Sequence, residues 1–387
     1  MKGLCRGYYH QQSGYNRKRY LFKRESSSKA GVTMDQRITE HAKILVDYSC
    51  QIKKGDHVVV VVEDYGQELA NEIVKEVAKR GGTTVVLQRS PETERALLDA
   101  VPEEYVDNFP DHLFEMIKKT DVYIKIQSTA NTRALGNVSP EKFVRYQRMQ
   151  KPLKQEILTK RWCGTATPTP ALAQEAGMSL REYEDFVYNT IIRDWEKEAE
   201  IMYKVKEIID KGKEVYIEGE DTELTMSVEG RVAVASVGKH NMPSGEVFTA
   251  PVDDSTNGHI YFDIPLVYFG SLIEDVRLTF ENGVVAESSA SRNEDMLKKL
   301  IETDEGSNKL GELGIGTNRG ITTFTRNILF DEKIGDTIHL ALGNAYKACN
   351  GVNESAIHMD IVKTMKNGRL LVDGEVLQEN GKWFWEL

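Results

Sequence analysis

A short stretch, SAIHMDIV at residues 355–362, has the residue types of a buried strand but carries a histidine and an aspartate two positions apart. Side chains of an extended chain alternate between two faces, so His358 and Asp360 share one face while the other face is apolar. Two ionisable groups on an inner face cost free energy unless something compensates for their lost hydration. An ion pair between the two side chains would compensate, and so would a bound metal ion.

Four further polar side chains of the C-terminal half stand in apolar or glycine-rich surroundings. Glu246 lies in MPSGEVFTAP, Glu312 in LGELGIGTN and His339 in DTIHLALG. Each alone has an ordinary structural explanation, since a histidine in a strand is commonly part of the core and a glutamate beside glycines commonly caps a turn. Tyr346 follows His339 by seven residues, and its phenol could either donate a hydrogen bond to an oxyanion or only pack.

Together, the three carboxylates and two imidazoles would suit a pair of divalent metal ions. As neutral imidazoles and ionised carboxylates they carry a charge of −3, which two divalent ions and a bridging hydroxide would cancel. Hard oxygen and borderline nitrogen ligands favour Zn, Co, Mn or Mg over copper or iron–sulfur chemistry. Two ions ~3.5–4 Å apart commonly hydrolyse amides, because they turn water into hydroxide near neutral pH and polarise the carbonyl.

The half of the chain that precedes these residues has a different pattern. From residue 34 to about residue 205, helical and strand patterns alternate. Residues 58–62 form a continuous apolar run, which is typical of a strand buried on both faces of a parallel sheet. A helical pattern over residues 67–82 ends at two glycines, and a strand pattern follows. We therefore expect an α/β N-terminal domain over residues 34–205, with an open, mainly parallel sheet.

The pattern changes after residue 205 to short β segments separated by turn signals. Asn282-Gly283, Asp373-Gly374 and Asn380-Gly381 are typical of tight hairpins. Residues 206–387 are therefore expected to form a β-rich α+β catalytic domain, with mainly antiparallel strands in a curved sheet or barrel. A length of 387 residues also favours two domains.

The charge of the chain is unevenly distributed. Residues 1–33 have a net charge of +7 in a chain of −10, so the rest carries −17. We expect this basic head to be disordered, as an extension ahead of a start at Met34, a targeting segment or a nucleic-acid arm. The acidic body predicts no nucleic-acid partner, and the absence of an apolar window of ~18 residues predicts no membrane span. Four cysteines without a C-x-x-C pair favour a reducing cytoplasm.

The motifs also resemble those of a known family. MPSGEVFTAP, GELGIGTN, HLALGNAY and NESAIHMDIV, with PTPALAQEAGMSLREYEDFVY upstream, are similar in content and order to motifs of the thermophilic aminopeptidase family. This family includes aminopeptidases T and S and PepS-like enzymes, and the resemblance covers nearly all of residues 34–387. It implies a cytosolic, homodimeric metalloexopeptidase with two divalent metal ions per chain, acting on peptides with a free N-terminus.

The resemblance also implies a role for each candidate residue. The metal ligands fall on Glu246, Glu312, His339, His358 and Asp360, and the active-site tyrosine falls on Tyr346. A hydroxide bound by both metals would attack the peptide carbonyl. We assign to Glu312, in addition, the transfer of the proton to the leaving amine.

Two rival functions remain open from the sequence. A mononuclear non-haem iron oxygenase needs two histidines and one carboxylate, for which His339, His358 and Asp360 suffice. It leaves Glu246 and Glu312 without a role. A non-enzymatic two-domain binding protein would use the polar cluster only as a buried network.

Overall fold

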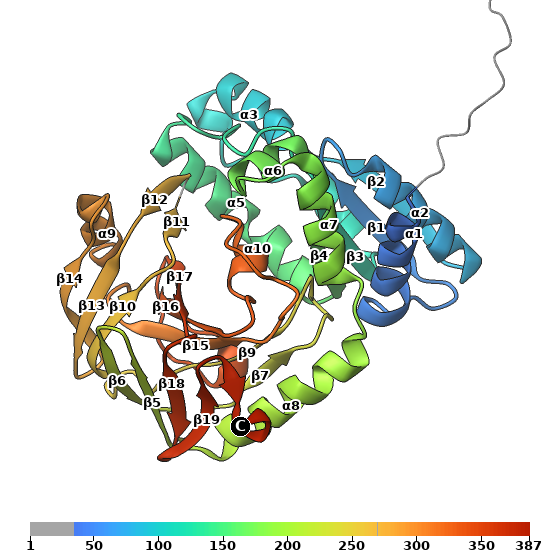
Figure 1. The fold of residues 1–387 in the computed structure, drawn as a ribbon. Helices are drawn as coiled ribbons and strands as arrows, with labels where there is room; N and C mark the ends of the chain where they lie inside the picture. The colour runs from blue at the N-terminus through green and yellow to red at the C-terminus, as the bar shows by residue number, and fades with distance from the viewer. Residues whose placement is uncertain (1–34, 269) are drawn as a thin grey trace, which may run out of the picture. The chain divides into compact units, whose positions relative to one another are not determined.

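The computed structural model describes residues 35–268 and 270–387 (Figure 1). The predicted disorder of residues 1–33 concerns a segment outside these described residues. The first described helix begins after Asp35, whose carboxylate accepts a hydrogen bond of 2.9 Å from the backbone N–H of Arg37. A helix N-cap of this kind satisfies a backbone donor that has no partner within the helix.

The N-terminal region is built on a parallel sheet with the strand order β2-β1-β3-β4-β8. Its strands are β1 (His57–Val62), β2 (Thr83–Gln88), β3 (Val122–Gln127), β4 (Arg161–Ala166) and β8 (Asn241–Met242). Four of the five come from the segment for which a parallel sheet is predicted. The fifth strand, β8, comes from the C-terminal half.

Helices cover both faces of this sheet. The helices of this region are α1 (Gln36–Lys43), α2 (Gln67–Lys79), α3 (Pro91–Ala100), α4 (Asp111–Lys118), α5 (Pro140–Leu158), α6 (Pro170–Glu175), α7 (Leu180–Ile191) and α8 (Trp195–Lys211), of which α8 packs mainly on the C-terminal core. Val58, Val60 and Val62 pack in a core with residues of α1, α2 and α7. Val59 and Val61 pack on the other face with residues of α4 and α5. The apolar run is continuous because neither face of β1 meets water.

Among the described residues, the C-terminal region contains two large antiparallel sheets and a two-stranded one, rather than the expected single curved sheet or barrel. The eight-stranded sheet runs β14 (Val284–Ser289), β13 (Val276–Glu281), β10 (Asn257–Phe262), β6 (Thr222–Ser227), β5 (Glu214–Gly219), β18 (Arg369–Val372), β19 (Glu375–Glu379) and β20 (Lys382–Trp383). The five-stranded sheet runs β17 (His358–Thr364), β16 (Thr337–Gly343), β15 (Leu310–Gly316), β9 (Glu246–Thr249) and β7 (Val234–Ser236). The region also contains the hairpin β11 (Leu266–Tyr268) and β12 (Ser271–Ile273), the helices α9 (Glu294–Ile301) and α10 (Ile328–Asp331), and the short 3-10 helices η3 (Lys347–Cys349) and η4 (Phe384–Glu386).

A shared apolar core explains why there are two sheets. One face of the five-stranded sheet, with Leu313, Leu340 and Ile361, packs in the same core as Ile217 and Leu224 of the eight-stranded sheet. Strands alternate their side chains, so the other face of the five-stranded sheet is free to carry polar residues.

The two regions are joined by backbone pairing as well as by sequence. Gly164 and Thr165 of β4 pair with Asn241 and Met242 of β8, and the Thr165 hydroxyl donates a 2.7 Å hydrogen bond to the Met242 carbonyl. The predicted boundary at residues 205–206 falls within α8, and the division into two domains stays a prediction. Within residues 35–268 and 270–387, no helix combines the length and apolar character needed to cross a membrane.

Candidate metal centre

The five predicted ligand residues lie on four neighbouring strands of the five-stranded sheet. Glu246 is the first residue of β9, Glu312 lies in β15, His339 in β16, and His358 and Asp360 in β17. All five occupy alternate positions that share the face opposite the apolar core. The structure therefore brings together all five residues that were predicted from the sequence to be metal ligands.

Small residues on the same face make room for the ligands. Gly314 pairs with His339, and Ala341 lies between Glu312 on one neighbouring strand and Asp360 on the other. The imidazole of His339 lies directly over Gly314, since a Cβ atom at that glycine would be 1.9 Å from Nε2. The glycine-rich run around Glu312 thus leaves space for a histidine from the next strand.

Replacing Gly314 with alanine is expected to displace the His339 ring and to weaken metal affinity by ~10- to 100-fold, the range seen when residues that orient metal ligands are changed. Metal titration followed by calorimetry would measure the change. Gly164→Ala is the matched control, because a Cβ there would meet Asn241 Oδ1 at an ordinary 3.5 Å. Equal metal affinity in the Gly314 variant and the wild type would contradict the expected role of this space.

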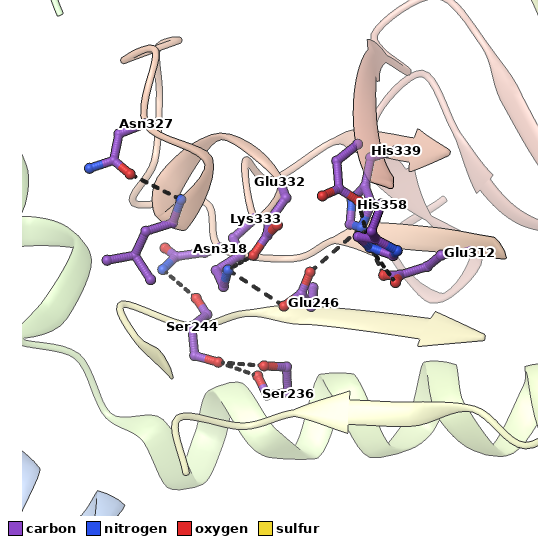
Figure 2. A network of polar contacts seen from close by, with 12 residues as sticks. Ser236, Ser244, Glu246, Glu312, Asn318, Asn327, Glu332, Lys333, His339 and His358 are labelled. Carbon is purple, nitrogen blue, oxygen red and sulfur yellow. Dashed lines mark hydrogen bonds and ion pairs between the residues drawn. The ribbon is translucent and has the colours of Figure 1, made fainter. Parts of the chain in front are cut away.

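Figure 2 shows how the side chains of four of the ligands, Glu246, Glu312, His339 and His358, converge. Glu312 stands between the two histidines, with Oε1 3.2 Å from Nε2 of His339 and Oε2 3.4 Å from Nε2 of His358. Glu246 Oε2 lies 3.7 Å from His339 Nε2, and Asp360 Oδ1 lies 3.4 Å from His358 Nε2. The residues form two groups of three, Glu246–Glu312–His339 and Glu312–His358–Asp360, each with ligand atoms within 4.8 Å of one another. Glu312 belongs to both groups.

Burial and hydrogen bonding fit these groups to a cation. Glu246, Glu312 and His339 are buried. Within the described part of the chain, Glu312 Oε2 and His339 Nδ1 are buried without a hydrogen bond. His358 Nδ1 lies 2.8 Å from the Asn344 carbonyl, so Nδ1 donates there and Nε2 is the nitrogen that faces the carboxylates. The donor set of carboxylate oxygens and imidazole nitrogens suits a divalent ion.

The carboxylates also make the site attractive to positive charge of any kind. Burial alone would lower the pKa of His339, but Glu312, Asp360 and Glu246 raise it to about 9. At His358, burial also lowers the pKa, but the carboxylates of Asp360 and Glu312 have the larger effect and raise it to about 11. Without a metal ion the imidazoles thus hold protons, which a metal ion would displace.

A buried lysine and a glutamate extend the site, and both were missed from the sequence. Lys333 is completely buried, with Nζ 3.5 Å from Glu246 Oε1 and in contact with Glu332 Oε1 (Figure 2). Burial disfavours its charge, but Glu246 and Glu332 raise its pKa. Burial raises the pKa of Glu332 to about 8, although the charge of Lys333 opposes this shift. In the sequence, DEKIGD reads as an exposed turn, and only the apolar residues on either side could have signalled burial.

The backbone that presents Glu246 is also held from several directions. Asn318 Nδ2 donates 2.8 Å and 3.3 Å hydrogen bonds to the carbonyls of Ser244 and Thr190. Ser244 Oγ donates a 2.6 Å hydrogen bond to the Ser236 carbonyl (Figure 2). These bonds connect the start of β9 to β7 and to α7, so the position of Glu246 depends on both regions of the fold.

Tyr346 lies beside the ligand cluster. Its ring centroid is 5.0 Å from that of His358 and 5.5 Å from that of Phe248, and the residue is 45% exposed. Partial burial and the surrounding carboxylates raise the pKa of the phenol, so the hydroxyl keeps its proton. A protonated phenol can donate a hydrogen bond at any ordinary pH.

The cluster opens into a large cavity. His358 and Asp360 line a space of about 960 Å³, whose other walls come from both regions of the fold. Cavities of ~300–1,000 Å³ enclose small organic ligands. The site therefore has room for a substrate beside the ligand groups.

The known proteins that this chain resembles in sequence and in structure include several that are named aminopeptidases. Aminopeptidase AmpS of Bacillus subtilis is 26% identical over 91% of this chain and 99% of its own length. Aminopeptidase T of Thermus aquaticus is 24% identical over 90% of this chain and 98% of its own. The solved structure of wild-type AmpT from Thermus thermophilus superposes with a TM-score of 0.81 at 22% identity, and covers 90% of this chain and 99% of that one.

The comparisons place the chain among the metal-dependent proteases, which are hydrolases. The chain belongs to the family described as thermophilic metalloprotease (M29), whose pattern matches residues 34–383. This confirms the family and the enzyme class predicted from the motifs, and the superposition confirms the predicted fold class. Membership argues against both rivals, the iron oxygenase and the non-enzymatic binding protein.

Proposed function

We propose that this chain is an aminopeptidase that releases N-terminal residues from peptides with the help of two divalent metal ions. The observation that carries the proposal is the presence of two three-residue ligand groups that share Glu312. Glu246, Glu312 and His339 would hold one ion, and Glu312, His358 and Asp360 the other. Zn, Co, Mn and Mg all suit this mixture of oxygen and nitrogen donors. The relatives named as aminopeptidases support the reaction.

Two divalent ions, when bound, would supply hydroxide near neutral pH and polarise the peptide carbonyl. The protein's own contribution is to bind and orient the substrate. The peptide would lie in the cavity with its α-amino end at the acidic cluster, since carboxylates attract a positive group. The Tyr346 phenol would donate a hydrogen bond to the oxygen that gains negative charge as the carbonyl is attacked.

A carboxylate must also carry a proton to the leaving amine. We assign this transfer to Glu312, as the sequence suggested. Glu332 is a second candidate because it belongs to neither ligand group, its side chain is 17% exposed and it lies beside Lys333 in the same site.

Elemental analysis of the purified protein, combined with hydrolysis of aminoacyl-anilides with and without a chelator, tests the proposal. About two divalent ions per chain and activity that the chelator abolishes are expected. N-acetylated substrates should not be cleaved, because they lack the free α-amine. A single iron, or turnover that survives metal removal, would overturn the proposal.

Replacing Tyr346 with phenylalanine is expected to lower kcat by ~100- to 1,000-fold, the usual cost of losing one oxyanion donor, and to change KM little. The ring remains, so packing against Phe248 and His358 should persist. Steady-state kinetics on an anilide would measure the effect, with Tyr105→Phe as the control at an exposed tyrosine outside the site. An unchanged kcat would assign Tyr346 to packing alone.

We further propose a cytoplasmic homodimer, which the family resemblance implies. The outer strand β2 is one surface that a second copy could cover, because Val85 and Val86 are 47% and 37% exposed there. Light scattering should give twice the mass of one chain. A monomeric mass across the micromolar range would contradict this assembly.

A further inference from the structure

The cavity beside the metal centre carries positive charge on another part of its wall. The same space of about 960 Å³ that His358 and Asp360 line is also lined by Arg133, Arg292 and Arg326. Two members of the ligand cluster and three arginines thus line the same space. A zwitterionic ligand would find opposite charges for its two ends there.

Two of these arginines lack good partners. Arg133 Nε lies 3.4 Å and Arg326 Nη1 lies 3.9 Å from the oxygens of one carboxylate, that of Glu175. Glu175 Oε1 instead accepts a 2.8 Å hydrogen bond from the Thr132 hydroxyl. Among residues 35–268 and 270–387, neither guanidinium has a hydrogen-bond acceptor, and the pair has one positive charge more than its single carboxylate balances.

Three other charged residues of the cavity wall already have hydrogen-bond partners within the protein. Arg292 donates a 2.9 Å hydrogen bond to Glu274. Glu63 accepts a 2.8 Å hydrogen bond from the Ser128 backbone N–H, and Asp331 accepts two of 2.8 Å from the N–H and hydroxyl of Thr325. Arg133 and Arg326, whose side chains are 63% and 41% exposed, are therefore two charged donors of the wall that a ligand could engage.

The backbone at Arg326 is consistent with a functional position. Its φ of 63° lies in the left-handed region, which residues other than glycine seldom adopt and which is enriched at ligand sites. Guanidinium groups bind carboxylates with paired hydrogen bonds, which makes arginine suited to recognising this group.

We infer that Arg133 and Arg326 form a carboxylate-binding subsite, which makes short peptides carrying a carboxylate inside the cavity the preferred substrates. This inference rests on the proposed aminopeptidase function and adds its substrate class. The α-amino end would bind at the metal centre and the carboxylate at the two arginines. The carboxylate could be the C-terminus of a short peptide or an Asp or Glu side chain near the cleaved bond.

Matched peptides separate these possibilities. The metal-loaded enzyme would be assayed on Leu-Gly-Gly and its C-terminal amide, and on the amides of Leu-Asp-Gly and Leu-Asn-Gly, with leucine anilide as the common reference. We expect the wild type to prefer one carboxylate member of these pairs by ~10-fold or more in kcat/KM, because a hydrogen bond to a charged group discriminates at this level. The pair that shows the preference identifies the source of the carboxylate.

The doubly substituted enzyme Arg133→Gln/Arg326→Gln should reduce that preference to about 1, while Arg181→Gln, at an exposed arginine outside the cavity wall, should keep it. A wild type that cleaves leucine anilide but treats both pairs alike would overturn the inference and leave the aminopeptidase proposal standing. A preference that persists in the double variant would also overturn it. Failure to cleave any of the substrates with metal bound would instead refute the proposed function.

Discussion

Replacing Glu312 with glutamine is expected to lower kcat/KM by about 1,000-fold or more and to reduce the bound metal below two ions per chain. Glu312 contributes to both ligand groups, so one substitution weakens both ions. Metal ions supply several kcal/mol of transition-state stabilisation, and each ~1.4 kcal/mol corresponds to a factor of ten in rate. Elemental analysis and kinetics at saturating metal would measure the two effects separately.

The same experiment distinguishes the roles given to Glu312. If the variant loses metal, Glu312 is a ligand shared by the two ions. If kcat is low while two ions are bound, Glu312 carries the proton to the leaving amine. Glu332→Gln provides the comparison, because unchanged kcat there leaves the proton transfer with Glu312. Glu281→Gln, at an exposed position of β13, is the control for a change of charge. If the Glu312 variant binds two ions and is fully active, Glu312 is neither an essential ligand nor the proton carrier.

Replacing Lys333 with methionine is expected to lower the free energy of unfolding of the metal-free protein by ~3–5 kcal/mol. The lysine is fully buried, and its removal takes the neighbouring cation from Glu332 and one of two from Glu246, which keeps His339 at 3.7 Å. Breaking a buried ion pair by removing one partner usually has a cost of this size. Urea unfolding in the presence of a chelator would measure it.

Two further variants sharpen this test. The double variant Glu332→Gln/Lys333→Met should recover part of the lost stability, since it also removes the carboxylate that loses its neighbouring cation. Lys197→Met breaks an exposed pair with Asp194 and should change stability by less than ~1 kcal/mol. A Lys333 variant as stable as the Lys197 variant would show that the buried ammonium does not compensate the carboxylates.

The sequence was sufficient to predict those features of the fold that depend on the residue pattern of a single strand or helix. The run of valines in β1 predicts a strand covered on both faces, and helices do cover both faces. The alternation in SAIHMDIV predicts which residues face the core, and Met359 and Ile361 lie there while His358 and Asp360 share the other face. In each case the evidence lies within one element.

The sequence was insufficient to predict those features that depend on pairing between segments far apart in the chain. Nothing around Asn241 and Met242 indicates that they extend the parallel sheet, because a two-residue strand has no measurable periodicity. The shared position of Glu312 follows only from the register of β15 between its neighbours. Lys333 was missed because a lysine in a charged segment is ordinarily exposed.

The pairing of β8 has a consequence for attempts to exchange parts of this enzyme with those of its relatives. Only residues 243–245 separate β8, which belongs to the N-terminal sheet, from Glu246 at the start of β9. A graft cut near residue 205 would therefore combine one parent's β4 with the other parent's β8, and any mismatch would shift a ligand directly. Chimaeras should keep β4, β8 and β9 from the same parent, and natural changes in these strands should tend to occur together.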